Sequence, residues 1–326
     1  MRNVIGSVIG VALVAVAVGM NAKASMSVEA HPSYNKDCTL IPGDIYDPAP
    51  MFRVGPYKGK CMLDTTNRSV ILLDDNEKDH YSLPLNQVAL ANFSHENKYW
   101  IASMDTSGID EVIFQTEYFP AAFGIPAAHT ELRFKMKPGS EINLIEQNPA
   151  PGAEPTRMKM SNFTYSVEAV RPFSNEHYDV IKGVMAHYGL AYRFVSQEDR
   201  YIWMVPTSHH TVKQVTLLLN DRQKQEILET AIKLSDQKGM DQIYDTVNYS
   251  CTTELFKVVD GVVQYHSFRK MAVHLNAILG KQTDPPMAED ALRIRGLFGK
   301  RLPLMADDKE MIATFDPSHL VSETSP

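Results

Sequence analysis

The stretch Thr-Glu-Leu-Arg-Phe-Lys-Met, residues 130–136, alternates apolar and charged side chains along its length. Neighbouring side chains of a strand point to opposite faces of a sheet, so Leu132, Phe134 and Met136 share one face and the charged residues share the other. We therefore predict a half-buried strand with its apolar face toward the core. The Lys-Pro-Gly-Ser sequence at 137–140 predicts the turn that ends it.

Short apolar runs and alternating patterns predict further strands on both sides of this one. Patterns that are apolar on only one face are typical of antiparallel sheets, whereas parallel strands are buried on both faces. The expected strands cover residues 69–73, 111–114, 163–167, 201–205 and 212–219.

Helical periodicity replaces the alternation from Asn220 onward. Asn220 and Gln223 have the spacing of a capping box, and Gly239 is expected to end the first helix. A second helix is expected from near Thr252 to Asp260-Gly261. Together, strands and helices predict an α+β domain in which an antiparallel sheet packs with helices. The apolar stripe of the first helix consists of Ile227, Leu228, Ala231, Ile232 and Leu234.

Cys251 is expected at the N-terminus of the second helix, because polar, turn-prone residues lead into it and an apolar helical pattern follows. The positive end of the helix dipole and its free N–H groups favour a thiolate. The same N–H groups can hold an oxyanion during acyl transfer. The alternative is a small buried cysteine at a helix cap, and the neighbouring residues do not decide between the two.

A cysteine nucleophile needs a base, and the chain has 11 histidines. His129 is the first candidate, because it stands directly before the alternating strand and follows small residues that leave room for a second reactant. The competing candidate is the pair His209-His210, directly before another expected strand. No His/Cys/Asp cluster has metal-ligand spacing and no glycine-rich phosphate loop occurs, so no metal or other cofactor is expected.

The composition restricts the class of protein. The 326 residues include 32 Lys and Arg against 39 Asp and Glu, a formal net charge of −7. Nucleic-acid binding requires clustered basic residues, and no basic run occurs, so a nucleic-acid-binding protein is not expected. With 44% hydrophobic and 22% charged residues, the chain is neither collagen-like nor of low complexity.

The N-terminus has the pattern of a secretory signal peptide: a basic start, a continuous apolar stretch at 4–20, and Ala22-Lys23-Ala24. Cleavage after Ala24 would release an exported protein, and an uncleaved membrane anchor is the alternative. Frequent prolines predict an irregular N-terminal extension and a loosely ordered C-terminal one. The expected divisions are 1–24 for the signal peptide, 25–60 for the first extension, 61–281 for the domain and 282–326 for the second extension.

Four short blocks follow one another along the chain. They are residues 118–134, which include Ala-His-Thr-Glu-Leu-Arg-Phe, then Tyr-Ser-Val-Glu-Ala-Val-Arg at 165–171, Glu-Asp-Arg at 198–200, and residues 244–253, which end in Ser-Cys-Thr-Thr. In this order they resemble the blocks of a family of exported bacterial domains named after the periplasmic domain of the lipoprotein N-acyltransferase Lnb. The resemblance covers residues 54–261, with one extra residue before the Arg of the second block.

The resemblance implies roles for particular residues and a fold. Cys251 would be the nucleophile, His129 its base and Glu168 the carboxylate that orients the imidazole, with Asp199 as the rival carboxylate. The implied fold is a permuted papain-like (NlpC-type) architecture, in which a cysteine at a helix N-terminus faces a histidine on the sheet. Ser250 departs from the family pattern, which has Asn directly before the cysteine.

With the export signal, the resemblance implies a periplasmic, cysteine-dependent acyl hydrolase or acyltransferase of the bacterial cell envelope, acting through a thioester on Cys251. The implied partner is an envelope lipid, lipoprotein or peptide substrate, with peripheral membrane contact. Two alternatives stay open: a peptidoglycan or peptide amidase of NlpC type, and a non-catalytic envelope binding protein, which Ser250 would allow.

Cys38 and Cys61 are expected to form a disulfide while Cys251 stays free, because the first two share a Pro/Gly-rich stretch of an exported protein. In the chain-entropy model such a loop closure stabilises the fold by about 3 kcal/mol, and two independent thiols are the alternative. Non-reducing peptide mapping should recover one cross-linked Cys38–Cys61 peptide. A bridge from Cys251 to either residue would contradict this pairing.

Overall fold

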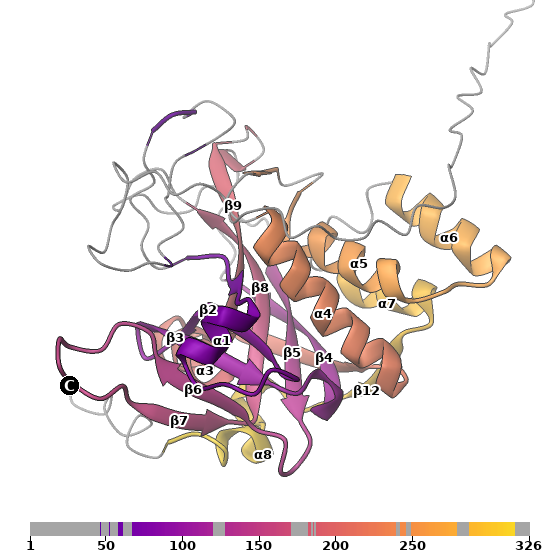
Figure 1. Ribbon diagram of the computed structural model, residues 1–326. Coiled ribbons are helices and arrows are strands. Elements are labelled where there is room, and N and C mark those ends of the chain that lie inside the picture. Colours follow the sequence, from indigo (N-terminus) through magenta and orange to yellow (C-terminus); the bar gives the residue numbers. More distant parts are fainter. Residues whose placement is uncertain are drawn as a thin grey trace, which may run out of the picture. The chain divides into compact units, whose positions relative to one another are not determined.

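A computed structural model gives the fold (Figure 1) and describes residues 46, 52, 58–60, 67–119, 128–170, 182–183, 185, 187–238, 242–245, 249–278 and 287–316. The chain divides into two compact units, Met1–His31 and Pro32–Pro326, and every described residue belongs to the second. The expected signal peptide, Cys38, Cys61 and Gly239 lie outside the described residues, so the disulfide and the helix end at Gly239 stay predictions. Among the helices of the described ranges, none is long and apolar enough to cross a membrane.

The second unit is built on one mixed, 12-stranded sheet. Among the pairings of described strands, β2 with β9 is parallel and the others are antiparallel, so the α+β class is confirmed. Off the main path, β1 (Ile71–Leu72) pairs with β2 and β11 (Ile243–Tyr244) with β9. The main order is β12 (Phe298–Arg301), β10 (Thr211–Leu217), β4 (Ile109–Tyr118), β5 (Ala128–Met136), β8 (Asn162–Val170), β9 (Tyr188–Ser196), β2 (Val88–His95), β3 (Lys98–Met104), β6 (Ile142–Glu146) and β7 (Arg157–Met160).

Four of the strand predictions are confirmed in location, and a fifth is confirmed in its centre. Strand β5 contains the alternating stretch, and β4, β8 and β10 contain or largely cover the expected strands at 111–114, 163–167 and 212–219. The run at 69–73 forms a strand only at β1. The expected turn after β5 is present, with the N–H of Ser140 bonded to the carbonyl oxygen of Lys137 at 3.0 Å.

The strand expected at 201–205 is wrong, because these residues are helical. Helix α3 (Gln197–Ile202) continues into the π-helical turn η3 (Trp203–Thr207). Ser196 caps α3 by accepting the N–H of Asp199 at 3.1 Å, and this local cap starts a helix that includes the short apolar run. Met204 then packs into a small apolar cluster while Trp203 is largely exposed.

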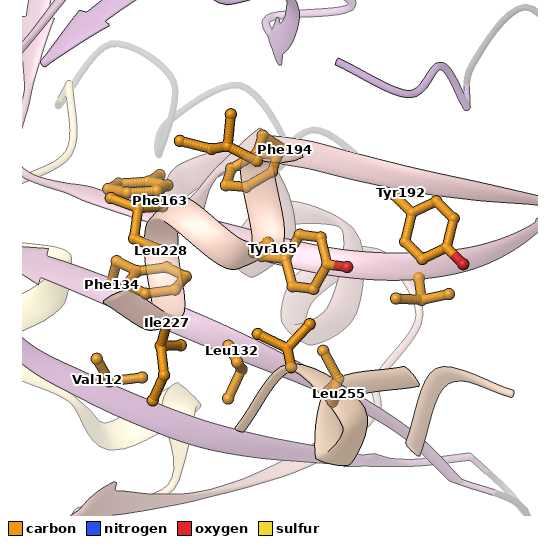
Figure 2. Packing of buried hydrophobic residues seen from close by; sticks show 14 of the residues in the cluster. Val112, Leu132, Phe134, Phe163, Tyr165, Tyr192, Phe194, Ile227, Leu228 and Leu255 are labelled. Atoms are coloured by element: carbon orange, nitrogen blue, oxygen red, sulfur yellow. The ribbon is translucent and has the colours of Figure 1, made fainter. Parts of the chain in front are cut away.

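The prediction of a half-buried β5 is also wrong, because both of its faces are covered. Figure 2 shows Leu132 and Phe134 packed with Phe163 of β8 and with residues of α4 (Asp221–Lys238) and α5 (Cys251–Val262). The rings of Phe134 and Phe163 stack with their centroids 5.2 Å apart. On the opposite face Glu131 is 0% and Arg133 3% exposed. An alternating pattern identifies the two faces of a strand but does not show what covers each of them.

The helices supply the layer over the apolar face. The capping box at Asn220 and Gln223 is confirmed, with reciprocal bonds of 3.0 and 2.9 Å. Of the predicted stripe, Ile227, Leu228, Ala231 and Ile232 are buried in the main core and Leu234 packs against it. Helix α5 starts as expected and ends at Val262, just beyond the predicted Asp260-Gly261. The other helices within the described residues are α1 (Asp75–His80), η2 (Thr106–Gly108), α6 (Ser267–Ile278), α7 (Ala288–Arg295), η5 (Met305–Asp307) and α8 (Lys309–Ile312).

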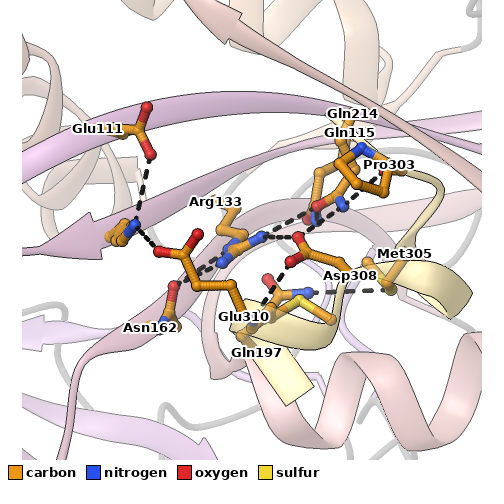
Figure 3. A network of polar contacts seen from close by, with 12 residues as sticks. Glu111, Gln115, Arg133, Asn162, Gln197, Gln214, Pro303, Met305, Asp308 and Glu310 are labelled. Atoms are coloured by element: carbon orange, nitrogen blue, oxygen red, sulfur yellow. Dashed lines mark hydrogen bonds and ion pairs between the residues drawn. The ribbon is translucent and has the colours of Figure 1, made fainter. Parts of the chain in front are cut away.

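The C-terminal residues 287–316 pack onto the sheet, so the expectation that they are loosely ordered is wrong for this range. Strand β12 pairs with β10. Figure 3 shows the buried Arg133 bonded to the segment that follows β12 in the chain. The guanidinium of Arg133 bonds Asp308 at 3.0 Å, Gln214 at 3.1 Å and Asn162 at 2.9 and 3.1 Å. A buried cation must be paired, and Asp308 of the C-terminal segment supplies the negative charge.

Replacing Asp308 by Ala should lower the free energy of unfolding by about 3 kcal/mol, because it leaves the buried Arg133 charge unpaired and removes the cap of α8. Urea titration followed by circular dichroism measures the loss. Asp307→Ala is the matched control, since Asp307 is the exposed neighbour on η5. Equal losses in the two variants would contradict the role of the buried ion pair.

Candidate active site

Cys251 is the first residue of α5, and a capping box fixes where this helix begins. The side chain of Ser250 accepts the N–H of Thr253 at 3.3 Å, and the Thr253 hydroxyl accepts the N–H of Ser250 at 2.7 Å. The Cys251 side chain is buried, with 2% exposure. Ser and Asn cap helices about equally well, so Ser250 keeps the capping function at the position where the sequence departs from the pattern.

His129 lies near the start of β5, where the pairing of β5 with β8 has ended. The registered pairs of these two strands stop at Glu131 and Ser166, whereas the pairing of β5 with β4 continues through His129. His129 points to the same face of the sheet as Glu131, and Thr130 points to the face that α5 covers. The imidazole is buried, with 9% of the residue exposed.

Strand β5 and helix α5 meet through neighbouring residues of each. The Thr130 hydroxyl donates to the Thr252 hydroxyl at 3.0 Å, and the Thr252 hydroxyl lies 3.8 Å from the sulfur of Cys251. The His129 side chain and the backbone of Thr130 also interact with the thiol, and both interactions lower its pKa. The structure therefore brings together Cys251 and His129, which are far apart in the sequence.

The other side of the imidazole faces strand β8. His129 Nε2 lies 2.7 Å from Ser166 Oγ, and the Ser166 hydroxyl donates to Glu168 Oε1 at 2.8 Å. The direct separation between His129 Nε2 and Glu168 Oε1 is 3.7 Å, which is too long for a hydrogen bond. Since Nε2 faces Ser166, Nδ1 is the ring nitrogen left for the thiol.

The charges around the two side chains favour a thiolate–imidazolium pair. Burial by itself raises the pKa of Cys251, but the charge and hydrogen bond of His129 lower it from the ordinary 9.0 to about 7. Burial by itself lowers the pKa of His129, but the charges of Glu168 and Cys251 raise it from 6.5 to about 10. Between these two pH values the sulfur is negative and the imidazole positive.

Glu168 is ionised over the same range. Burial by itself raises its pKa, but the positive charges of His129, Arg200 and Arg193 lower it to about 2. Its side chain is 20% exposed, so it is the most accessible group of the three. A negative carboxylate beside His129 stabilises the imidazolium.

Arg200 of α3 lies between three carboxylates. Its guanidinium is 2.7 Å from Glu131 Oε2, 3.4 Å from Glu168 Oε1 and 3.6 Å from Glu117 Oε2. Glu131 is fully buried, and burial raises its pKa although the charge of Arg200 opposes the shift. Arg200 thus neutralises part of the negative charge of these three carboxylates, and its ion pair with Glu168 holds that side chain in position.

The rival candidates His209, His210 and Asp199 lie elsewhere and contact other residues. His210 Nδ1 is 2.6 Å from Glu117 Oε1, and His209 has a positive φ of 54° in the turn before β10. Asp199 accepts the backbone N–H of Glu96 at 3.2 Å and lies 3.5 Å from His95 Nδ1. In the part of the chain that the structure describes, the interactions of Cys251 include neither His209 nor His210, and those of His129 do not include Asp199.

Sequence reasoning did not single out Ser166, Thr130 or Thr252. Ser166 and Glu168 are two residues apart on one strand and therefore share a face, which is the signal that could have joined them. Thr130 and Thr252 are the direct neighbours of His129 and Cys251. Within the described ranges, no group of three or more His, Cys, Asp and Glu residues is arranged to hold a metal ion.

Comparison with known proteins gives one match. The chain matches the family described as the Lnb N-terminal periplasmic domain over residues 96–278, more than half of its length. This range begins later than the resemblance at 54–261 and extends past its end, and it contains Cys251, His129, Ser166 and Glu168. No curated protein and no solved structure matches the chain at a significant level.

The rate of Cys251 alkylation by iodoacetamide should rise with pH around a midpoint near 7, since the thiolate is the reacting form. Mass spectrometry of the Cys251 peptide separates this thiol from any other. His129→Ala removes the interactions that oppose the effect of burial on the pKa of Cys251. The midpoint of the alkylation profile should therefore return to 9 or above. At pH 7 the thiolate fraction then falls by about 50-fold.

His210→Ala is the matched control and should leave the midpoint in place, because His210 pairs with Glu117 and not with the thiol. The assignment of His129 would be wrong if its replacement left the midpoint unchanged while His209→Ala or His210→Ala shifted it.

Proposed function

Because the chain belongs to the family of the Lnb N-terminal periplasmic domain, we propose that it is an exported, cysteine-dependent acyl hydrolase or acyltransferase of the bacterial cell envelope. The observation that carries the proposal is the buried pairing of Cys251, at a helix N-terminus, with His129, on the strand that this helix start contacts. Cys251 is the nucleophile, His129 is the acid and base, and Glu168 orients the imidazole.

In the first half of the reaction, the Cys251 thiolate attacks the carbonyl carbon of an acyl donor and forms a C–S bond. The imidazolium of His129 then donates its proton to the departing oxygen or nitrogen as the bond to the leaving group breaks. The product is a thioester on Cys251 and a neutral imidazole. In the second half His129 takes a proton from water or from an acceptor nucleophile, whose attack releases the thiolate and the acyl product.

The start of α5 supports the charge that develops on the carbonyl oxygen. The capping box uses the N–H of Thr253, which leaves the N–H groups of Cys251 and Thr252 in the first turn to stabilise an oxyanion. Backbone donors at a helix N-terminus keep their orientation through the reaction, so little reorganisation accompanies the change in charge.

The proposal includes a permuted papain-like (NlpC-type) arrangement. The histidine strand β5 precedes the cysteine helix α5 in the chain, and the helix begins beside the end of the strand that carries His129. This arrangement of a cysteine at a helix N-terminus against a histidine on a sheet supports the assignment by analogy.

Two alternatives share the same site. A peptidoglycan or peptide amidase would use the same thiolate and acid–base pair on an amide carbonyl. A non-catalytic binding protein would keep the fold without the chemistry, but the Ser250 cap and the charge state of Cys251 support an enzyme. The substrate is proposed to be an envelope lipid, lipoprotein or peptide, with peripheral contact between the protein and the membrane.

Intact-protein mass spectrometry after incubation with envelope extract tests the function. An enzyme of the proposed type should gain the mass of a fatty acyl group on Cys251, and hydroxylamine should remove it, as expected for a thioester. Cys251→Ala is the control and should gain nothing. A peptide-derived mass on Cys251 would favour the amidase, and binding without any added mass in the wild-type protein would favour the non-catalytic alternative.

Glu168→Gln should lower acyl turnover on the order of 100-fold, because an amide cannot stabilise the imidazolium as a carboxylate does. Asp199→Asn should leave turnover unchanged, since Asp199 contacts His95 and Glu96 instead. Steady-state turnover of the acyl donor identified above measures both. A large loss only in Asp199→Asn would transfer the orienting role to Asp199, and no loss in either would reduce the site to a Cys–His dyad.

A further inference from the structure

We propose that Ser166 is a positioning residue of this site: its hydroxyl bridges His129 and Glu168 and fixes which nitrogen of the imidazole faces the thiol. The inference rests on the proposed function, in which His129 exchanges a proton with Cys251. It differs from a simple Cys–His–Glu triad, because the carboxylate acts on the imidazole through an intervening hydroxyl group.

The distances place the hydroxyl between the two charged groups. Ser166 Oγ is 2.7 Å from His129 Nε2 and 2.8 Å from Glu168 Oε1, whereas the imidazole and carboxylate are 3.7 Å apart. Ser166 is completely buried, so bulk water does not compete for its hydroxyl. The two short contacts can both be hydrogen bonds, but the direct contact cannot.

The single proton of the hydroxyl determines the direction of both bonds. Glu168 is ionised and can only accept, so the Ser166 hydroxyl donates to it. The oxygen of Ser166 then has lone pairs for His129, and Nε2 must carry the hydrogen. In the neutral imidazole this places the basic lone pair on Nδ1, which is the nitrogen that can accept the proton of Cys251.

The backbone explains why a bridge is required. Ser166 is held in the last registered pair between β8 and β5, opposite Glu131, so its position relative to β5 is fixed. His129 and Glu168 each lie two residues further, beyond the registered pairing, where the two strands no longer hold their side chains at pairing distance. The serine hydroxyl fills the remaining separation.

Arg200 holds the Glu168 carboxylate in place, so this carboxylate does not move into direct contact with His129. Glu168 Oε1, the oxygen that accepts from Ser166, is also 3.4 Å from Arg200 Nη1, and Arg200 is held by Glu131 at 2.7 Å. A shift of this oxygen toward His129 would weaken its attraction to a buried guanidinium. The hydroxyl therefore transmits the negative charge of Glu168 to the imidazole while the carboxylate stays on Arg200.

NMR of the full chain with ¹⁵N-labelled histidine tests the bridge without any substrate. In Cys251→Ala, where no thiolate competes for the hydrogen, His129 should carry it on Nε2 when neutral, and Nδ1–H would overturn the inference. Ser166→Ala should lower the titration midpoint of His129 by at least about one pH unit, a tenfold increase in its acid dissociation constant. Ser166→Thr keeps the hydroxyl and should retain the wild-type midpoint.

Thr164→Val is the matched control. Thr164 is a fully buried residue of the same strand and face, and its hydroxyl donates to Gln197 at 2.6 Å instead of contacting the site. This variant should leave the His129 midpoint unchanged. An unchanged midpoint in Ser166→Ala, or an equal shift in Thr164→Val, would overturn the inference, and if Ser166→Ala does not fold, the tautomer of His129 in Cys251→Ala decides it.

The outcome is separable from that of the proposed function. If Cys251 is never acylated but the His129 midpoint depends on Ser166, the proposed function fails and the bridge stands. If Cys251 is acylated and Ser166→Ala leaves the His129 midpoint unchanged, the function stands and the bridge fails.

Discussion

Strand β5 buries two of the charged side chains on its polar face, and the pairing of these charges determines much of the surrounding structure. Glu131 and Arg133 are almost completely buried, and an unpaired charge in such a place costs several kcal/mol. Each therefore has a partner from a distant part of the chain: Arg200 of α3 for Glu131, and Asp308 before α8 for Arg133. The segments that cover this face are held there by the charges they neutralise.

The candidate site lies at the end of the same strand and follows the same rule. His129 is on the charged face, and its partners are Ser166 and Glu168 on one side and Cys251 on the other. A thiolate and an imidazolium neutralise each other, so the buried pair is compatible with its surroundings when both groups are charged. The charges of Glu168 and Cys251 make the imidazolium, rather than the neutral ring, the stable form near neutral pH.

The two faces of β5 carry side chains of different chemistry. The apolar face joins β5 to α4 and α5 through side chains such as Leu132 and Phe134, and this packing holds α5 against the strand. The polar face holds the imidazole and its carboxylate. Cys251 belongs to a helix on the first face and reaches a histidine on the second, beside the end of the β5–β8 pairing. The site therefore depends on the position of a helix N-terminus relative to one strand.

The sequence by itself determined the local elements and singled out the two side chains of the candidate pair. Alternation at 130–136 identified β5, the Asn220–Gln223 box identified the start of α4, and polar residues before an apolar run placed Cys251 at a helix start. These signals are local, since periodicity and capping involve residues a few positions apart. The pairing of Cys251 with His129 was suggested by their order and by the family blocks.

Only the tertiary structure decided what covers each face and which polar groups meet. The docking of 287–316 and the burial of Arg133 depend on contacts between residues far apart in the sequence. Ser166 enters the site because the β5–β8 register ends beside it, and a register is set by the whole sheet rather than by one strand. Periodicity reports which residues share a face, whereas the partner of that face comes from the packing of the complete chain.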